Sequence, residues 1–120
     1  MTGLDAVTAW VVAYRAAWES NDPRAVGDLF AADAAYFTEP YAEPWLGRER
    51  IVEQWLSRRD DPGTTFFEWH PLLVTPDQAV VQATTTYPEE TFSNLWVLRL
   101  DHTGQARQFT EWWMQHPRKG

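Results

Sequence analysis

Two glutamates in this sequence stand where a carboxylate could exchange a proton with an apolar molecule. Glu39 opens the first of two Glu-Pro pairs in residues 36–48, and each proline biases the residue before it toward extended backbone. Glu111 lies two residues from Phe109 and two from Trp113, so strand alternation places these three side chains on one face. A carboxylate beside aromatic rings is a group that general acid–base catalysis can use. We therefore take both glutamates as candidate catalytic residues.

Each glutamate also has an interpretation without chemistry. A carboxylate buried among aromatic side chains is costly unless it finds a partner or loses its charge. Glu111 could thus form a structural bond with an arginine or a backbone amide, or it could be a pocket acid with a raised pKa. Glu39 could be a general base at the mouth of a pocket, or a solvated carboxylate beside Pro40. Glu43, in the second Glu-Pro pair, has the same two interpretations.

The number of aromatic side chains is high for 120 residues. The chain has eight Trp, six Phe and four Tyr. This is more than a minimal core needs, so part of them should line a cavity or an interface. For each ring the alternative is plain packing in the core. The rings that we expect around a ligand pocket are Tyr41, Trp45, Trp55, Trp69, Trp96 and Trp113.

Apolar spacing predicts helices in the first half of the chain and strands in the second. The expected helices are 4–18, 23–33 with Leu29 and Phe30 on its apolar face, and 48–59. The expected strands are 34–38, 65–74, 79–87, 91–100 and 105–115. Two helix starts carry capping signals, because Thr2 and Asp5 could form a capping box and Asp22 could cap a helix that begins at Pro23.

This order of elements predicts an α+β fold in one domain. Helices followed by consecutive antiparallel strands should cover one face of a strongly curved, mostly antiparallel sheet. A cavity would lie between the helices and the sheet, and the inward strand residues would decide what it holds. The length suits a single domain over residues 1–120, with 117–120 as a tail.

Composition and charge exclude several classes of function. A net charge of −7 makes nucleic acid and anionic membranes poor partners. The absence of cysteine excludes disulfides and thiolate chemistry, and His70, His102 and His116 have no partner at metal-ligand spacing. We therefore expect no metal and no cofactor. No signal peptide is recognised, and no apolar run approaches the ~20 residues that cross a bilayer, so we expect a soluble cytoplasmic protein.

Three segments together resemble the nuclear-transport-factor-2-like superfamily, and within it the SnoaL-like group. They are YRAAWESND at 14–22, VGDLFAADA at 26–34, and Gly47-Arg48 before a helix. The resemblance implies a cone-shaped α+β barrel with three helices, a hydrophobic pocket, and a homodimer formed through the outer face of the sheet. The superfamily contains isomerases, cyclases, dehydratases and hydrolases as well as domains that only bind or dimerise, so the resemblance does not choose among them.

Steroid delta-isomerase is a better understood relative, and the match to it is partial. Tyr14 matches its oxyanion-hole tyrosine in the first helix. Glu39 lies beside a proline as the isomerase's catalytic base does, but one residue later and as glutamate instead of aspartate. Trp96 falls where the isomerase has a second acid, and Glu111 falls where it is apolar. The missing acid argues against steroid isomerisation itself.

The middle strand should also face the pocket. The same resemblance implies that Val81, Ala83, Thr85 and Tyr87 point inward, and the small side chains of Ala83 and Thr85 would leave room for a ligand or for a neighbouring ring. Thr85 and Tyr87 therefore join the expected substrate-binding residues.

Three hypotheses remain open. The first is a cofactor-independent acid–base enzyme acting on a small, largely apolar organic molecule, with Glu39 or Glu111 moving the proton and Tyr14 donating a hydrogen bond. The second is a non-catalytic domain that binds a small molecule in the same pocket. The third is a dimerisation module whose pocket is packed core. For a homodimer, the outer-face residues Thr110, Trp112 and Met114 are the candidates.

Overall fold

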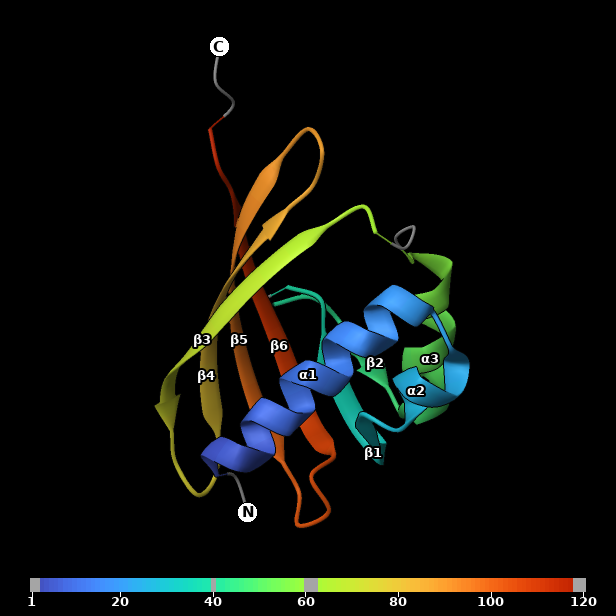
Figure 1. The fold of residues 1–120 in the computed structure, drawn as a ribbon. Coiled ribbons are helices and arrows are strands. Elements are labelled where there is room, and N and C mark those ends of the chain that lie inside the picture. Colours follow the sequence, from blue (N-terminus) through green and yellow to red (C-terminus); the bar gives the residue numbers. More distant parts are fainter. Residues whose placement is uncertain (1–2, 40, 60–62, 118–120) are drawn as a thin grey trace.

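One curved sheet positions every part of the fold (Figure 1). The computed structural model describes residues 3–39, 41–59 and 63–117. In chain order the elements are α1 (Leu4–Ser20), α2 (Pro23–Gly27), β1 (Phe30–Phe37), β2 (Trp45–Leu46), α3 (Arg48–Ser57), β3 (Phe66–Val74), β4 (Ala79–Thr86), β5 (Thr91–Leu100) and β6 (Ala106–Gln115). Figure 1 shows α1 crossing in front of the sheet, with α2 and α3 together beside it. The predicted α+β class with helices on a curved sheet is confirmed, although α3 follows β1 and β2 instead of preceding all the strands.

The sheet order explains how the two halves of the chain meet. Within the described residues the strands follow the order β2-β1-β6-β5-β4-β3. Strands β3 to β6 form an antiparallel meander, whereas β1 pairs with β6 in parallel. The last strand in chain order, β6, therefore lies inside the sheet, between β1 and β5.

Helix α1 is held to the sheet by its apolar face. Val7, Val11 and Tyr14 are buried, as their spacing predicts, and the indole N–H of Trp10 donates to the Leu29 carbonyl at 2.9 Å. The C-cap residue of the helix is Asn21, whose backbone is left-handed with φ 53°. Its N–H donates to the Ala17 carbonyl at 2.8 Å.

The start of α1 differs from the prediction. Thr2, the first member of the expected capping box, lies outside the described residues. The N-cap residue is Gly3, and no side chain of the described residues caps the helix. At α2 the prediction is confirmed, because Asp22 accepts the N–H of Arg24 at 3.1 Å and Pro23 occupies the first turn.

The helix predicted to extend to residue 33 was wrong in its second half. Helix α2 ends at Gly27, and Phe30 begins β1. The backbone of Ala106 donates to the Leu29 carbonyl at 2.8 Å, and Phe30 pairs with Ala106 in the parallel ladder. Pairing with a strand 76 positions away in sequence, from 30 to 106, buries Phe30 completely, and this overrides the helical spacing.

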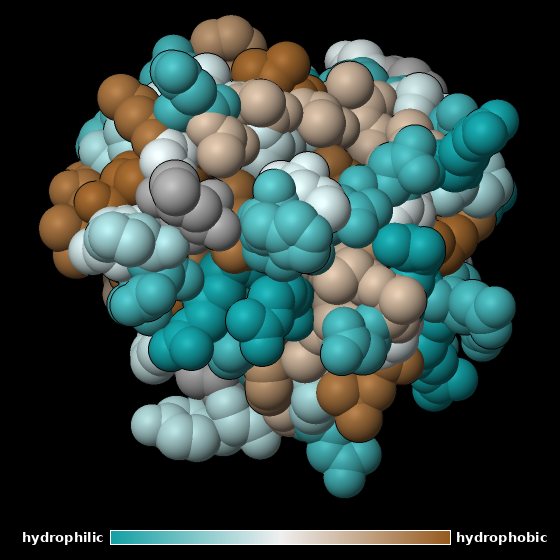
Figure 2. Space-filling model, turned by 90° about the horizontal axis from the view of Figure 1, so that it is seen from below, coloured by the Kyte–Doolittle hydropathy of each residue, from teal (hydrophilic) through white to brown (hydrophobic). Residues whose placement is uncertain are grey.

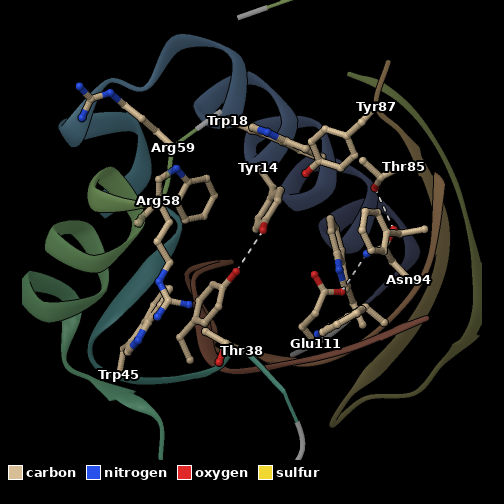
Figure 3. A pocket seen from close by; sticks show the side chains of 15 residues that line it. Tyr14, Trp18, Thr38, Trp45, Arg58, Arg59, Thr85, Tyr87, Asn94 and Glu111 are labelled. Atoms are coloured by element: carbon tan, nitrogen blue, oxygen red, sulfur yellow. Dashed lines mark hydrogen bonds between the residues drawn. The ribbon is translucent and has the colours of Figure 1, made fainter. Parts of the chain in front are cut away.

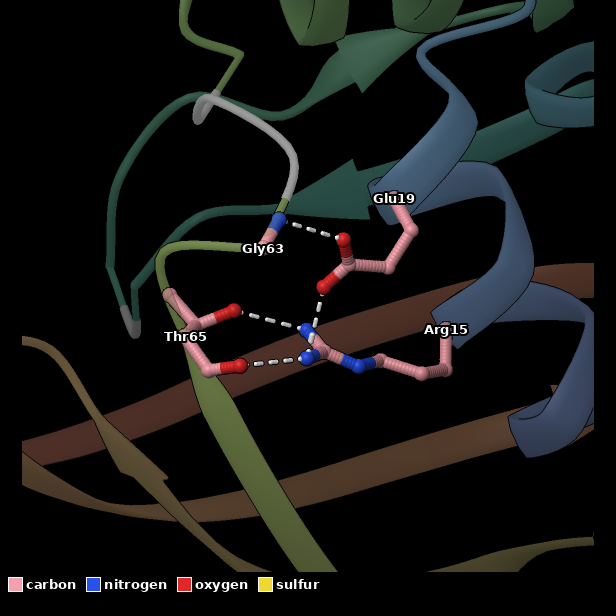
Figure 4. Close-up of polar contacts among 4 residues, drawn as sticks. All are labelled: Arg15, Glu19, Gly63 and Thr65. Carbon is pink, nitrogen blue, oxygen red and sulfur yellow. Dashed lines mark hydrogen bonds and ion pairs between the residues drawn. The ribbon is translucent and has the colours of Figure 1, made fainter.

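A polar clamp joins α1 to the segment that leads into β3 (Figure 4). Arg15 donates from Nη1 to the Thr65 hydroxyl at 2.8 Å and from Nη2 to the Thr65 carbonyl at 2.7 Å. Glu19 pairs with Arg15 at 2.7 Å and accepts the N–H of Gly63 at 2.8 Å. Arg15 and Glu19, one turn apart on α1, thereby hold the segment that precedes β3 against the helix.

The core is aromatic on the concave side of the sheet. Trp96, Phe30 and Phe109 are its largest fully buried side chains, and burial of side chains of this kind contributes about 1.5–3 kcal/mol each. Strand β4 alternates as expected, with Val81, Ala83 and Thr85 buried, while the outer face of β6 leaves Trp112 and Met114 exposed. Within the described ranges, no helix has both the length and the apolar character needed to cross a membrane.

Candidate functional site

A cavity of about 410 Å³ opens between the helices and the concave face of the sheet (Figure 3). Its walls are mostly aromatic, with a few polar groups that point inward. The residues lining it are Tyr14, Trp18, Tyr36, Thr38, Trp45, Trp55, Arg58, Arg59, Thr85, Tyr87, Phe92, Asn94, Trp96, Glu111 and Trp113. Its size and lining are those of a pocket for a small organic molecule.

Three polar side chains form a chain of hydrogen bonds across one wall of this pocket. The Thr85 hydroxyl donates to Oδ1 of Asn94 at 2.8 Å, and Nδ2 of Asn94 donates to Oε2 of Glu111 at 3.3 Å. The three residues come from the neighbouring strands β4, β5 and β6. Each faces inward because of strand alternation, so the sheet itself aligns them. Figure 3 shows both bonds and the carboxylate directed into the pocket.

Burial raises the pKa of Glu111 to about 7. Its carboxyl is removed from water by the aromatic walls, which disfavours the charged form. The N–H groups of Asn94 and Trp96 act in the opposite direction and lower the pKa. Nε1 of Trp96 is buried without a hydrogen-bond partner among the described residues, so we treat its effect as that of a nearby dipole. At neutral pH, Glu111 can therefore both accept and release a proton.

Two tyrosine hydroxyls meet on the opposite wall. The hydroxyl oxygens of Tyr14 and Tyr36 lie 3.1 Å apart. Burial raises the pKa of both phenols well above the usual value, and the negative charge of Glu111 raises both further. Both phenols stay protonated at neutral pH, and one of the two hydroxyl protons forms the hydrogen bond between them. The second proton is available to an oxygen atom of a ligand.

Stacked rings fix the tyrosine pair and shape the pocket. Tyr36 stacks on Trp45 with ring centroids 4.7 Å apart, and Tyr14 contacts Trp55 at 4.8 Å and Trp96 at 4.6 Å. Such pairs contribute beyond their buried area and hold the rings in one geometry. On the side of the phenols, the wall of the pocket is thus made of rings that pack against one another.

Two arginines after α3 line the rim. The Arg58 guanidinium lies 5.4 Å from the centre of the Trp45 ring, and its charge lowers the pKa of Tyr36. Arg59 instead donates to the Leu56 carbonyl at 2.9 Å. In Figure 3, Arg58 reaches along the wall toward Trp45 while Arg59 points away from the cavity.

The structure brings most of the predicted site residues to this pocket. Those that line it are Tyr14, Trp45, Trp55, Thr85, Tyr87, Trp96, Glu111 and Trp113. Their catalytic and binding roles stay predictions.

Three predicted site residues lie elsewhere. Glu39 is exposed in the turn after β1, where its carbonyl accepts the N–H of Ala42 at 3.4 Å. Tyr41 follows in the same turn with left-handed backbone and a fully exposed side chain. Trp69, in β3, pairs with Ala83 of β4. Its side chain packs against the core and is not among the residues that line the cavity. The turn directs Glu39 and Tyr41 into solvent, and Glu43 is exposed as well.

The polar residues that sequence reasoning missed are Tyr36, Asn94, Arg58, Arg59 and Thr38, together with the rings of Trp18 and Phe92. Alternation could have found Asn94, which lies two residues before Trp96 on the same strand. Tyr36 could have been found in the same way from the buried Ala34. Arg58 follows a helix end, where no periodic pattern gives the direction of a side chain.

A second hollow, of about 660 Å³, lies at the other end of the sheet among polar side chains of the turns at 75–78 and 101–105. Figure 2 views the molecule from below and shows hydrophilic groups gathered at its centre. Acidic and basic side chains are mixed there, as with Asp77, Asp101 and Arg107. Among the described residues, no three His, Asp or Glu side chains come close enough together to hold a metal ion.

Comparisons with known proteins identify the family and the fold. The family model of the SnoaL-like domain matches residues 11–118. A nuclear-transport-factor-2-like protein of unknown function from Burkholderia xenovorans shares 15% identity and a TM-score of 0.75, covering 97% of this chain and 88% of that one. A steroid delta-isomerase from Pseudomonas aeruginosa has 16% identity and a TM-score of 0.64, with 96% and 82% covered.

A third solved structure gives the same result. A ketosteroid isomerase-like protein from Erwinia carotovora has 22% identity and a TM-score of 0.64, with 90% of this chain and 93% of that chain covered. No curated protein matches the chain. At these identities the solved structures establish the shared fold alone.

Proposed function

The chain belongs to the SnoaL-like domain family, and we propose that it is an acid–base enzyme acting on a small, largely apolar molecule that carries a carbonyl, hydroxyl or epoxide oxygen. One observation carries the proposal. The carboxyl of Glu111 lies in an aromatic pocket with a pKa of about 7, facing two protonated phenols. A group with that pKa can work as base and as acid at neutral pH.

The proposed reaction is proton transfer at carbon. Ionised Glu111 removes a proton from a carbon next to the polar group, so that a C–H bond breaks and the O–H bond of the acid forms. The electron pair moves toward the ligand oxygen, which accepts a hydrogen bond from the Tyr14–Tyr36 pair. Glu111 then returns the proton to another carbon, which gives isomerisation, or to a leaving oxygen, which gives elimination or ring opening.

A non-catalytic binding domain is the second candidate, and the position of Glu39 favours it. The expected base lies in solvent, so among the described residues the cavity has one carboxyl instead of two. The open volume supports either pocket function over a dimerisation module with a filled core, since Trp45, Trp96 and Trp113 line the cavity without closing it.

Two further parts of the proposal concern assembly and location. We propose a homodimer through the outer face of the sheet, where Trp112 is 46% and Met114 72% exposed next to Thr110. Exposed apolar side chains gathered on one face are typical of an interface. A cytoplasmic location is proposed from the sequence alone.

The test of the catalytic proposal is exchange of carbon-bound hydrogen with solvent. Proton NMR in D₂O would follow deuterium uptake next to the carbonyl of 2-tetralone, 1-indanone and their carboxylate-bearing analogues. Glu111→Gln should lower the exchange rate at least about a hundredfold, and Tyr14→Phe about tenfold or more. Glu68→Gln, on the exposed outer side of β3, is the matched control.

The outcome separates the candidates. Exchange that is lost in Glu39→Gln instead would move the base role to Glu39. A native protein that binds these ketones without any exchange that depends on Glu111 would be a binding domain.

A further inference from the structure

We propose that the pocket takes an anionic ligand, with a carboxylate or similar group of the ligand bound by Arg58 at the rim and the apolar body directed toward Glu111. This names the substrate class of the site described above, and it rests on the proposed function only in taking that pocket as the ligand site.

The position of Arg58 follows from the end of α3. Arg58 is the C-cap residue, and its N–H donates to the Trp55 carbonyl at 3.1 Å. From there the side chain runs back over the pocket wall, where the guanidinium lies 5.4 Å from the centre of the Trp45 ring. A guanidinium over an aromatic face is held in place by the ring quadrupole while its N–H groups remain free to donate at the edge.

Arg58 forms no ion pair in the described part of the chain. The ion pairs found there are Arg15–Glu19 and Arg50–Glu53, and Arg58 takes part in neither. The pKa of Glu111 is set by burial, Asn94 and Trp96, so Arg58 does not neutralise the pocket carboxyl. Arg58 is thus a cation without an ion pair on the wall of a mostly aromatic pocket, in a chain with a net charge of −7, and an anionic ligand can supply the missing partner.

The distribution of polar groups gives the ligand its direction. The charge of Arg58 is felt at the Tyr36 hydroxyl, whereas Glu111 lies across the cavity beside Asn94 (Figure 3). A ligand carboxylate on Arg58 would gain charge-assisted, two-pronged hydrogen bonds. Its apolar body would then follow the rings of Tyr36 and Trp45 and reach the phenol pair and Glu111. The pocket thus has one group for an anion and another for a reacting carbon.

The experiment compares acids with their isosteric neutral amides. Isothermal titration calorimetry would measure the affinity of 2-naphthoate against 2-naphthamide, and of 3-phenylpropanoate against 3-phenylpropanamide. A pH of 6 keeps the ligand acids ionised and most of Glu111 protonated. We expect at least one acid to bind the unchanged protein about three- to tenfold more tightly than its amide, a modest factor because Arg58 is exposed at the rim.

Variants identify the cation responsible. Arg58→Gln should abolish the preference for the acid and change the affinity for the amide less than about twofold, because the amide does not use the charge. Arg58→Lys should keep part of the preference, since lysine provides a point charge without the fork. Arg50→Gln, on the same helix and paired with Glu53, is the matched control and should keep it in full.

Several results would overturn the proposal: equal affinities for acid and amide in the unchanged protein, a preference that survives in Arg58→Gln, or no acid binding at millimolar concentration. An upward shift of the Glu111 titration in Arg58→Gln would also overturn it, because Arg58 would then be the partner of Glu111. Unchanged amide affinity shows that the variant pocket is folded. These measurements involve no turnover, so a binding preference without proton exchange would leave this inference standing and refute only the catalytic proposal.

Discussion

Nδ2 of Asn94 lies 3.3 Å from Oε2 of Glu111, while Oδ1 of the same amide accepts the Thr85 hydroxyl at 2.8 Å. The ionised carboxylate of Glu111 only accepts and so favours this orientation of the amide, and the Thr85 hydroxyl completes it by donating to Oδ1. A reversed amide would set its oxygen against the carboxylate oxygen and repel it. Through Asn94, a hydroxyl two strands away thus supports the hydrogen bond that lowers the pKa of Glu111, and this relationship can be tested by substitution.

We expect loss of the Asn94 donor to raise the pKa of Glu111. In Asn94→Leu the ionised carboxylate loses a hydrogen bond, and since such bonds to charged groups contribute about 1.5–3 kcal/mol, the titration should move upward by about one to two units. Thr85→Val should give a smaller shift in the same direction. Carbon-detected NMR of the Glu111 side chain measures both.

The neighbouring Thr84→Val serves as the control for these substitutions, because Thr84 belongs to the opposite face of β4. It should leave the titration unchanged. An unaltered Glu111 titration in Asn94→Leu would mean that the 3.3 Å contact carries no electrostatic weight.

The raised pKa of Glu111 should make the free energy of unfolding depend on pH. Its folded pKa of about 7 lies above the usual value of 4.5, so between these values the folded chain keeps a proton that the unfolded chain has lost. The free energy of unfolding should fall as pH rises through this window. The difference of 2.5 units bounds the effect at about 3 kcal/mol, less in practice because the side chain is partly exposed.

Glu111→Gln should abolish this fall in the free energy of unfolding with rising pH, because glutamine does not titrate. Urea unfolding should find the variant more stable than the unchanged protein by about 1–3 kcal/mol at pH 8 and similar to it at pH 4. Parallel pH profiles for the two proteins would contradict a burial-raised pKa.

The tyrosine pair should show strong coupling. Tyr14→Phe or Tyr36→Phe leaves one buried hydroxyl without its partner, at a cost of about 1–3 kcal/mol. The double variant removes both groups and should cost less than the sum of the two single changes. A thermodynamic cycle from chemical denaturation measures the difference. Additive effects would indicate that the 3.1 Å contact is not a hydrogen bond in solution.

The clamp on β3 should matter more than an ordinary surface ion pair. Arg15→Ala removes two hydrogen bonds to Thr65 as well as the pair with Glu19, and we expect a loss of about 1–3 kcal/mol in unfolding free energy. Arg50→Ala removes an exposed pair at 3.7 Å and should cost about 0.5 kcal/mol or less. Equal losses would mean that the clamp is dispensable.

The proposed homodimer predicts that a single substitution at Trp112 converts the dimer into a monomer. Sedimentation at micromolar concentration should give a dimer for the unchanged protein and a monomer for Trp112→Asp, because a carboxylate would be buried in the interface. Val12→Asp, on the exposed side of α1, should remain dimeric. A monomer in the unchanged protein would refute the dimer.

The strand residues of the site could be predicted because the sheet has a period of two. Once Glu111 is taken to share a face with Phe109, the positions of Trp113 and the opposing Trp96 follow, and the structure pairs Trp96 with Glu111 directly. The same rule extends to Asn94, which polar character alone did not suggest. Periodicity therefore reached most of the pocket from the sequence.

Positions outside the periodic elements could not be predicted in this way. The direction of Glu39 and Tyr41 is set by how the turn returns the chain to pair Trp45 with Tyr36, and this pairing is a tertiary contact. Phe30 has helical spacing, yet the ladder to Ala106 places it in a strand. Arg58 reaches the pocket because of a ring that belongs to another element. In each case a long-range contact determines where the residue lies, and the local sequence pattern does not predict that contact.

The place of β6 inside the sheet has a consequence for synthesis of the chain. A ribosome makes β1 and β5 before β6, so until residues 106–115 emerge both strands keep an unpaired edge beside the gap. The pocket cannot close during that interval, since Glu111 and Trp113 arrive with the last strand. Long-range parallel pairing such as that of β1 with β6 forms slowly, because the entropy of closing the long loop is lost before the contacts form. Glu111 thus joins the pocket in the same step that pairs the two exposed strand edges, and a nascent chain has no pocket before this sheet is complete.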